Sequence, residues 1–313
     1  MGGVGRNVPS GGRRLIFGRP SIVVGGPGRV GNPDGALTIS EWRPVRGQYK
    51  CEPGVAMFHP MHARLSEVPY LTLVIPAYNS AERLRRNLCE VLTFLSAQPY
   101  SAELIVVDDG SPQPAAGMLR EFARAHPMMR LIRNETNRGK GASVTRGMLA
   151  ARGEYRVFTD ADLSYPPDQI NKILRDLEAG ADVAIACRVL PESRYLMSPT
   201  FFHYLYTRHV MSRAFNLMVR TVMLRGVRDT QAGLKGFTAR AAQEVFPRLT
   251  IPRFGFDVEA LYVAQHRGLS VTQTAVHFRY DDEPSTVRFA QSAVTMAGEL
   301  FKIRWNDWRG RYA

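Results

Sequence analysis

The sequence predicts an α/β fold with a mostly parallel sheet flanked by helices on both faces. From residue 70 onward, short apolar segments alternate with segments whose apolar residues recur at helical spacing. This alternation is typical of strand–helix–strand units, whose crossovers make the strands parallel. Polar or acidic clusters follow three of the apolar segments directly. Ligands of parallel sheets bind beyond the carboxyl ends of the strands, so the clusters predict one site at one edge.

The individual elements follow from the apolar patterns and from the turns between them. Residues 71–76 form an apolar run that ends at a proline, which predicts a first strand. Segment 81–97 predicts a helix, because its apolar residues gather on one side. These are Leu84, Leu88, Val91, Leu92 and Leu95. The same criteria predict strands at 103–107, 129–133, 155–159 and 181–186, and helices at 115–125, 140–151 and 168–179.

Composition divides the chain into three parts. Residues 1–68 are rich in Gly, Pro and Arg and lack sustained periodicity, so we expect them to be disordered or loosely docked, with a possible short strand at 21–24. Residues 69–282 contain the strand–helix alternation and are expected to fold as one domain. Residues 283–313 predict an amphipathic C-terminal helix of basic and aromatic residues, suited to a membrane interface.

The chain carries 41 Lys and Arg against 28 Asp and Glu, a formal net charge of +13. Such an excess indicates an anionic partner, which would be a nucleic acid, a phosphorylated ligand or an anionic membrane surface, although solubility alone would also account for it. The three cysteines are scattered and lack C-x-x-C spacing. We therefore expect a reducing compartment, with neither a zinc site nor a disulfide framework.

Membrane association is predicted without a membrane span. The sequence has no apolar run of the roughly 18 residues that a spanning helix needs, and Gly, Pro and Arg interrupt the N-terminal stretches that a signal peptide would require. Segment 198–224 instead combines aromatic residues, Met and Leu with scattered Arg, which predicts amphipathic interfacial helices. A core helix with a solvated basic face is the alternative. We expect a cytoplasmic protein, peripheral or monotopic on the inner (cytoplasmic) membrane face.

Asp160-Ala161-Asp162 is the most informative motif of the chain. Its two carboxylates close the apolar segment 155–159 and would repel each other unless a cation lies between them. Oxygen ligands with open positions suit Mg²⁺ or Mn²⁺, so Asp160 and Asp162 are candidate metal ligands. A solvated loop with a capping Asp is the alternative, and the polar clusters at the other strand ends favour the metal site.

Six motifs in register resemble the family 2 glycosyltransferases, which have the GT-A nucleotide-diphospho-sugar transferase fold. They are Pro76-Ala77-Tyr78-Asn79, Val107-Asp108-Asp109-Gly110-Ser111, Asn137-Arg138-Gly139-Lys140-Gly141, Asp160-Ala161-Asp162, Arg228-Asp229-Thr230-Gln231-Ala232-Gly233-Leu234-Lys235 and Phe256-Asp257-Val258-Glu259. The last two look like the polyprenyl-phosphate (dolichyl-phosphate) sugar synthases, particularly the β-glucosyltransferase branch. The resemblance spans about residues 71–280 and implies that 69–282 is a GT-A catalytic domain.

The resemblance implies a donor site for a UDP-sugar. Tyr78 would line the base, and Asp109 would accept a hydrogen bond from the base N3–H. Lys140 would approach the phosphates together with the free N–H groups of a helix start. Asp160 would hold the ribose or a metal-bound water, and Asp162 the metal ion that bridges the diphosphate. The full set implied for nucleotide-sugar binding is Pro76, Ala77, Tyr78, Asn79, Asp108, Asp109, Lys140, Asp160, Ala161, Gln231, Lys235 and Glu259.

The resemblance also implies a polyprenyl-phosphate acceptor. Arg208 and Ser212 match an Arg and a Ser that grip the acceptor phosphate in the mannosyl branch, and their i,i+4 spacing puts both on one helix face. Arg188 matches a further phosphate ligand. Asp229 and Asp257 are the candidates to orient the sugar and the acceptor, or to act as a base. Because a lipid monophosphate is already anionic, positioning and charge stabilisation would carry most of the rate.

The resulting hypothesis is an inverting glycosyltransferase that moves a hexose, with glucose favoured, from a UDP-sugar to a polyprenyl or dolichyl phosphate. Its catalytic residues would be Asp162, Asp229 and Asp257. GDP-mannose or a UDP-N-acetylhexosamine as donor and a soluble phosphorylated acceptor are alternatives. A basic nucleic-acid-binding protein is the non-enzyme alternative, but no nucleic-acid motif supports it. Asp229 capping a turn and Glu259 capping a helix start are structural alternatives for those two residues.

Overall fold

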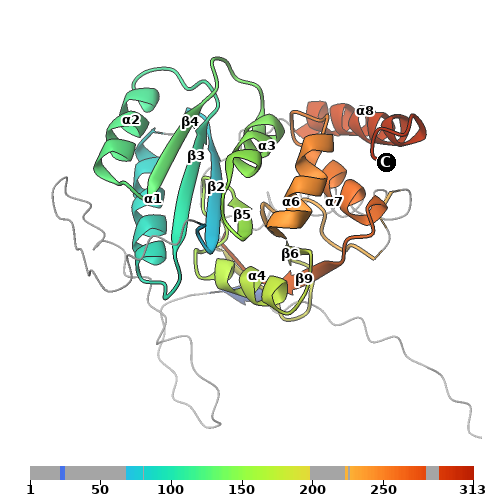
Figure 1. Ribbon diagram of the computed structural model, residues 1–313, viewed down its shortest axis with the longest axis horizontal. Coiled ribbons are helices and arrows are strands. Elements are labelled where there is room, and N and C mark those ends of the chain that lie inside the picture. The colour runs from blue at the N-terminus through green and yellow to red at the C-terminus, as the bar shows by residue number, and fades with distance from the viewer. Residues whose placement is uncertain (1–21, 25–67, 80, 198–222, 225, 280–288) are drawn as a thin grey trace, which may run out of the picture.

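The computed structural model describes residues 22–24, 68–79, 81–197, 223–224, 226–279 and 289–313. Figure 1 shows a central sheet with helices packed on both of its faces, as the sequence predicts. Segments 198–222 and 280–288 lie outside the described residues. The expected interfacial helices, with Arg208 and Ser212, therefore stay a prediction.

The elements alternate along the chain in the expected way as far as β6. The strands are β1 (Ile22–Val24), β2 (Leu71–Ala77), β3 (Ala102–Asp108), β4 (Met129–Arg133), β5 (Tyr155–Thr159), β6 (Val183–Cys187), β7 (Arg194–Met197), β8 (Leu234–Thr238), β9 (Val271–Ala275) and β10 (His277–Arg279). The helices are α1 (Ala81–Ser96), α2 (Ala115–Ala125), α3 (Lys140–Ala150), α4 (Gln169–Glu178), α6 (Ala239–Val245), the 3-10 helix η3 (Phe246–Arg248), α7 (Phe256–His266) and α8 (Phe289–Trp308).

The larger sheet brings the strand ends of the polar motifs to one edge. Its seven strands have the order β4-β3-β2-β5-β8-β6-β9, and β8 runs antiparallel to both of its neighbours. Strands β2, β3, β4 and β5 are parallel. Ala77 of β2 pairs with Asp108 of β3, and Val74 pairs with Phe158 of β5. The motifs that follow these strands therefore meet at one edge. A smaller parallel sheet contains β1, β7 and β10.

Alternate side chains of the strands pack against helices on opposite faces of the sheet. Leu73 and Ile75 of β2 belong to a buried cluster that includes the apolar sides of α1, α2 and α4. Val74, between them, belongs to a second cluster with α3, α6, α7 and α8. In Figure 1, α1 and α2 lie on one side of the sheet and α3 on the other. The apolar residues predicted for the inner side of α1 are all buried.

The C-terminal helix α8 is packed against the domain. Ile303 of α8 is fully buried in the cluster that contains α7. Tyr312, beyond the end of α8, is also fully buried, and its hydroxyl donates a hydrogen bond to Glu259 of α7 at 2.7 Å. The outer face of α8 exposes Phe301 and Trp308, so the helix is amphipathic. Among the described residues, no helix combines the length and apolar character needed to cross a membrane.

The described cysteines differ in state. Cys187 is a buried free thiol. Cys89 of α1 is disulfide-bonded. The expectation of reduced cysteines is therefore wrong for Cys89, because the spacing of cysteines along a chain does not show which of them meet in space.

Ile303→Ala should lower the free energy of unfolding by about 2–5 kcal/mol, because it removes buried methyl groups and leaves a cavity between α8 and the domain. Phe301→Ala, on the exposed face of the same helix, should change it by less than about 0.5 kcal/mol. Urea denaturation followed by circular dichroism measures both. Equal losses for the two variants would show that α8 is not docked through Ile303.

Candidate active site

The carboxyl ends of β2 and β3 are joined by Asp108. Its buried carboxylate accepts a hydrogen bond from the Ser111 backbone N–H at 2.9 Å and forms an ion pair with Arg133 of β4. The Ser111 hydroxyl in turn accepts from the backbone N–H of Asn79 at 2.9 Å. The predicted supporting residues Asn79 and Asp108 therefore lie in one network, next in sequence to the exposed ring of Tyr78.

Asp109 holds the loop that leads into α3. Its carboxylate accepts hydrogen bonds from the Asn134 side chain at 2.7 Å and from the backbone N–H groups of Arg138 at 2.9 Å and Gly139 at 2.8 Å. A carboxylate offers about four acceptor positions, so about one is left for a ligand. Gly139 has a φ of +98°, and a Cβ there would come within 2.5 Å of the Pro252 carbonyl oxygen. Only glycine fits this turn.

Lys140, the first residue of α3, neutralises the first acid of the Asp160-Ala161-Asp162 motif. Its Nζ lies 2.6 Å from Oδ1 of Asp160. Burial lowers the pKa of the Lys140 ammonium, but Asp160 and Asp257 outweigh it and raise that pKa. Gly233 approaches the same carboxylate, and a Cβ on Gly233 would lie 2.0 Å from Oδ2 of Asp160. A side chain at position 233 would therefore displace the Asp160 carboxylate from its present position.

Asp162 is the least compensated acid at this edge. Its basic partner, Arg83 of α1, is 3.9 Å away, and the Ser164 backbone N–H donates to it at 3.0 Å. Burial and, after it, repulsion from Asp160 raise the pKa of Asp162. Two neighbouring carboxylates with a cation deficit fit Mg²⁺ or Mn²⁺. The described residues contain no group of three or more His, Cys, Asp or Glu that could hold a metal.

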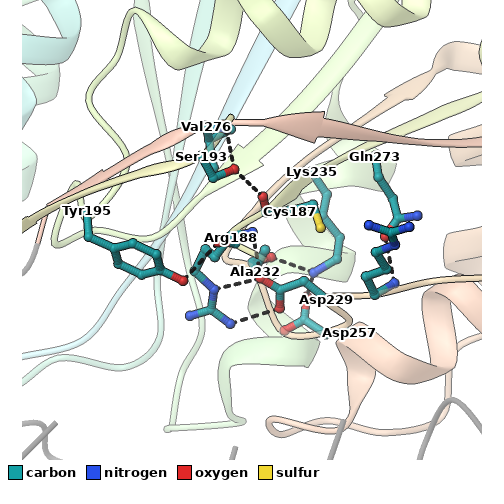
Figure 2. A network of polar contacts seen from close by, with 11 residues as sticks. Cys187, Arg188, Ser193, Tyr195, Asp229, Ala232, Lys235, Asp257, Gln273 and Val276 are labelled. Atoms are coloured by element: carbon teal, nitrogen blue, oxygen red, sulfur yellow. Dashed lines mark hydrogen bonds and ion pairs between the residues drawn. The ribbon is translucent and has the colours of Figure 1, made fainter. Parts of the chain in front are cut away.

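Asp229 and Arg188 form a buried bidentate ion pair (Figure 2). Nε of Arg188 donates to Oδ2 of Asp229 at 2.7 Å and Nη2 donates to Oδ1 at 2.9 Å, while the Arg188 backbone N–H donates to Oδ2 at 3.0 Å. Burial raises the pKa of Asp229, but Arg188 outweighs burial and holds that pKa below its usual range. The two residues were predicted separately, for the acceptor phosphate and for catalysis, and the structure brings them together.

Lys235 is a fully buried cation that supports the site from β8. Its Nζ donates to Asp257 at 2.5 Å and to the Ala232 carbonyl oxygen at 2.6 Å, as Figure 2 shows. Burial lowers the pKa of the Lys235 ammonium, and Asp257 opposes this shift. Through these two contacts, Lys235 links the loop before β8 to the start of α7. Its side chain has no exposed surface. This placement favours a supporting role over a contact with sugar.

Glu259 is used in the same structural way. Its carboxylate accepts from the backbone N–H groups of Thr250 and Ile251, both at 2.8 Å, and from the Tyr312 hydroxyl at 2.7 Å. These contacts give Glu259 a structural role that differs from the expected cap of a helix start, because its partners are the preceding loop and Tyr312. Gln231, half-buried, lies in the same loop as Asp229.

Two parts of the site were not predicted. Arg83 pairs with Asp162 from the neighbouring helix, and a helical Arg carries no local signal of such a role. Gly233 reaches Asp160, and its isolated position just before a strand was a possible signal, because such glycines often mark a close backbone approach.

Comparison with known proteins decides the family. The model described as Glycosyl transferase family 2 matches residues 72–230, about half of the chain. The chain belongs to this family. The matched range contains the ends of β2, β3 and β5 and closes at the loop that carries Asp229. Lys235 and Asp257 lie beyond the matched range.

Two relatives of this glycosyltransferase carry the same name. The dolichyl-phosphate beta-glucosyltransferase of Dictyostelium discoideum is 32% identical over 246 residues, which cover 75% of this chain and 74% of the relative. The human dolichyl-phosphate beta-glucosyltransferase is 31% identical over 250 residues, 76% of each chain.

A solved structure shows the same fold. It is glucosyl-3-phosphoglycerate synthase from Mycobacterium tuberculosis in complex with Mn²⁺, UDP-glucose and phosphoglyceric acid. It matches with a TM-score of 0.55 at 15% identity and covers 75% of this chain and 79% of that chain. The GT-A fold expected from the sequence is thereby confirmed.

Arg188→Ala should lower the free energy of unfolding at pH 7 by about 3–5 kcal/mol, because it leaves the Asp229 carboxylate buried without its partner. Arg240→Ala removes an ion pair with Asp182 in which the Arg side chain is 67% exposed, and should cost less than about 1 kcal/mol. Urea denaturation compares the two.

The same pair predicts a pH dependence. The pKa of Asp229 is lower in the folded than in the unfolded chain, where it is about 3.9, so the ion pair stabilises the fold above that pH and loses its effect as the pH falls through the folded value. The gap between wild type and Arg188→Ala should therefore narrow below about pH 4. A gap that is constant with pH would contradict the assignment to Asp229.

Proposed function

We propose that this glycosyltransferase moves glucose from UDP-glucose to a polyprenyl or dolichyl phosphate, with inversion at the anomeric carbon. The observation that carries the proposal is the match, over about three quarters of both chains, to dolichyl-phosphate beta-glucosyltransferases. The arrangement of acids and bases at the edge of the sheet supports it, because it suits a substrate with a phosphate leaving group.

The donor would lie across the ends of β2, β3 and β5. Asp109 has an acceptor position left for the uracil N3–H, and Tyr78, whose side chain is partly exposed, would line the base. Asp160 and Asp162 would hold Mg²⁺ or Mn²⁺, which would add positive charge beside the leaving diphosphate. Lys140 would supply a second positive charge from the start of α3.

The acceptor would attack without a strong general base. A phosphate monoester is ionised near neutral pH, so its oxygen can bond to the sugar carbon as the bond from that carbon to UDP breaks, and no proton has to move. Asp229, with its lowered pKa and its ion pair to Arg188, is a weak proton acceptor. It would instead orient substrate hydroxyls, and Asp257, fixed by Lys235, would do the same.

The outer face of α8 would lie on an anionic membrane surface. Phe301, Trp305 and Trp308 are 71%, 46% and 77% exposed and follow one another on one side of the helix. The ring centroids of Phe301 and Trp305 are 6.4 Å apart, and those of Trp305 and Trp308 are 5.1 Å apart. Exposed basic residues at the same end, Lys302 and Arg309 among them, complement anionic lipid headgroups.

Asp162→Ala should lower turnover by about 10²–10³-fold or more, because it removes one of the carboxylates that would hold the metal. Transfer of radiolabelled glucose from UDP-glucose to a short polyprenyl phosphate with Mn²⁺ measures it. Glu121→Ala, an exposed acid on α2, is the matched control and should keep wild-type turnover. Transfer by the wild-type protein to soluble phosphorylated acceptors alone would contradict the lipid acceptor.

The double variant Trp305→Ala/Trp308→Ala should lose most of its binding to liposomes that contain anionic lipid, because the aromatic side chains would supply the buried apolar area. Flotation at low and high salt measures binding. Leu149→Ala, at an exposed apolar residue of α3, is the control and should bind like wild type. Unchanged flotation of the double variant would exclude α8 as the docking face.

A further inference from the structure

The loop at residues 250–255, between η3 and α7, forms one wall of the site next to α3. A Cβ on Gly141 would lie 2.6 Å from the Ile251 carbonyl oxygen and 2.8 Å from that of Arg253. The Ala142 backbone N–H donates to the Pro252 carbonyl oxygen at 3.0 Å. Together with the contact at Gly139, these approaches place the loop directly against the turn that carries Lys140.

Buried and half-buried acids fix this loop at both ends. Glu259 of α7 accepts from the backbone N–H groups of Thr250 and Ile251, as described above. Glu299 of α8 accepts from the Gly255 backbone N–H at 3.0 Å, and Asn306 of α8 donates to the Thr250 hydroxyl at 2.8 Å. Hydrogen bonds from α7 and α8 therefore hold the two ends of the loop in place.

Arg253 is the exposed cation that this loop presents. Its Cγ would lie 3.1 Å from a Cβ on Gly139, so its stem passes over the turn before Lys140. The Arg253 guanidinium makes no hydrogen bond or ion pair with the residues that the structure describes. Burial raises the pKa of Glu299, and the charge of Arg253 is one of the smaller effects that oppose this shift, but no ion pair joins the two residues.

Three other cations close to the site have acidic partners. Lys140 pairs with Asp160, Arg188 with Asp229 and Lys235 with Asp257. Arg253, in contrast, makes no ion pair with the described residues and extends from a loop whose backbone is held beside the donor turn. A planar fork of N–H donors matches phosphate oxygens better than any other anion the proposed reaction offers.

We propose that Arg253 is a further substrate-binding residue that contacts a phosphate, either of the UDP-sugar or of the lipid acceptor. The inference rests on the proposed function and adds a residue to it. The phosphate chemistry is shared by the two substrates, and separate measurements for donor and acceptor identify which of them Arg253 contacts.

The test compares Arg253→Ala, Arg253→Lys and Arg120→Ala in the full-length protein. Arg120 is an exposed Arg on α2, on the opposite face of the sheet from α3, and controls for the loss of one positive charge. The donor arm is calorimetric titration with UDP-glucose and Mn²⁺. The acceptor arm is the KM for a short polyprenyl phosphate. Thermal denaturation checks that each variant is folded, and Arg253→Ala should leave the Tm unchanged.

Arg253→Ala should raise the donor Kd or the acceptor KM by about tenfold or more, since a charged hydrogen bond to phosphate is lost. Arg253→Lys should recover part of the loss, because it keeps the charge without the fork. Arg120→Ala should change neither constant by more than about twofold. Constants for Arg253→Ala that match those of Arg120→Ala would overturn the inference alone. A wild-type protein that neither binds UDP-glucose nor transfers glucose would overturn the proposed function and the inference with it.

Discussion

Charge balance at one edge of the larger sheet is the constraint on which the rest of the structure depends. Five acids lie at the ends of β3 and β5, in the loop before β8 or at the start of α7, and each is matched by a base from another element. The pairs are Asp108 with Arg133, Asp160 with Lys140, Asp162 with Arg83, Asp229 with Arg188 and Asp257 with Lys235. Removing one partner of a buried pair leaves a charge that the interior does not solvate. The elements must therefore assemble together.

The one weak pair in this set explains the expected chemistry. Asp162 faces Arg83 across 3.9 Å and has a raised pKa, whereas the other acids have close partners. A divalent cation would correct this deficit and would at the same time attract the diphosphate of a nucleotide sugar. The antiparallel strand β8 supports the arrangement. Gly233, directly before the strand, lies against Asp160, and Lys235 in the strand forms an ion pair with Asp257.

The sequence predicted the first half of the domain well and the second half poorly. Strands β2 to β6 and helices α1 to α4 have clear periodicity, and their expected bounds agree with the structure to within a few residues. Strand β8 was not predicted, because Leu234-Lys235-Gly236-Phe237 places a Lys and a Gly inside a short strand. That Lys is buried only through a tertiary contact with Asp257. The packing of Tyr312 against Glu259 and the position of Arg253 also depend on tertiary contacts, which no local sequence pattern predicts.

The most direct test of this account is calorimetric titration of the purified protein with UDP, first in the presence of EDTA and then in the presence of Mn²⁺. The account predicts that UDP binds with Mn²⁺ and that its affinity falls by at least about tenfold in EDTA, since Asp160 and Asp162 would then face the diphosphate without a bridging cation. Equal affinity for UDP under both conditions, or no binding under either, would contradict the assignment of the acidic edge as a metal-assisted donor site.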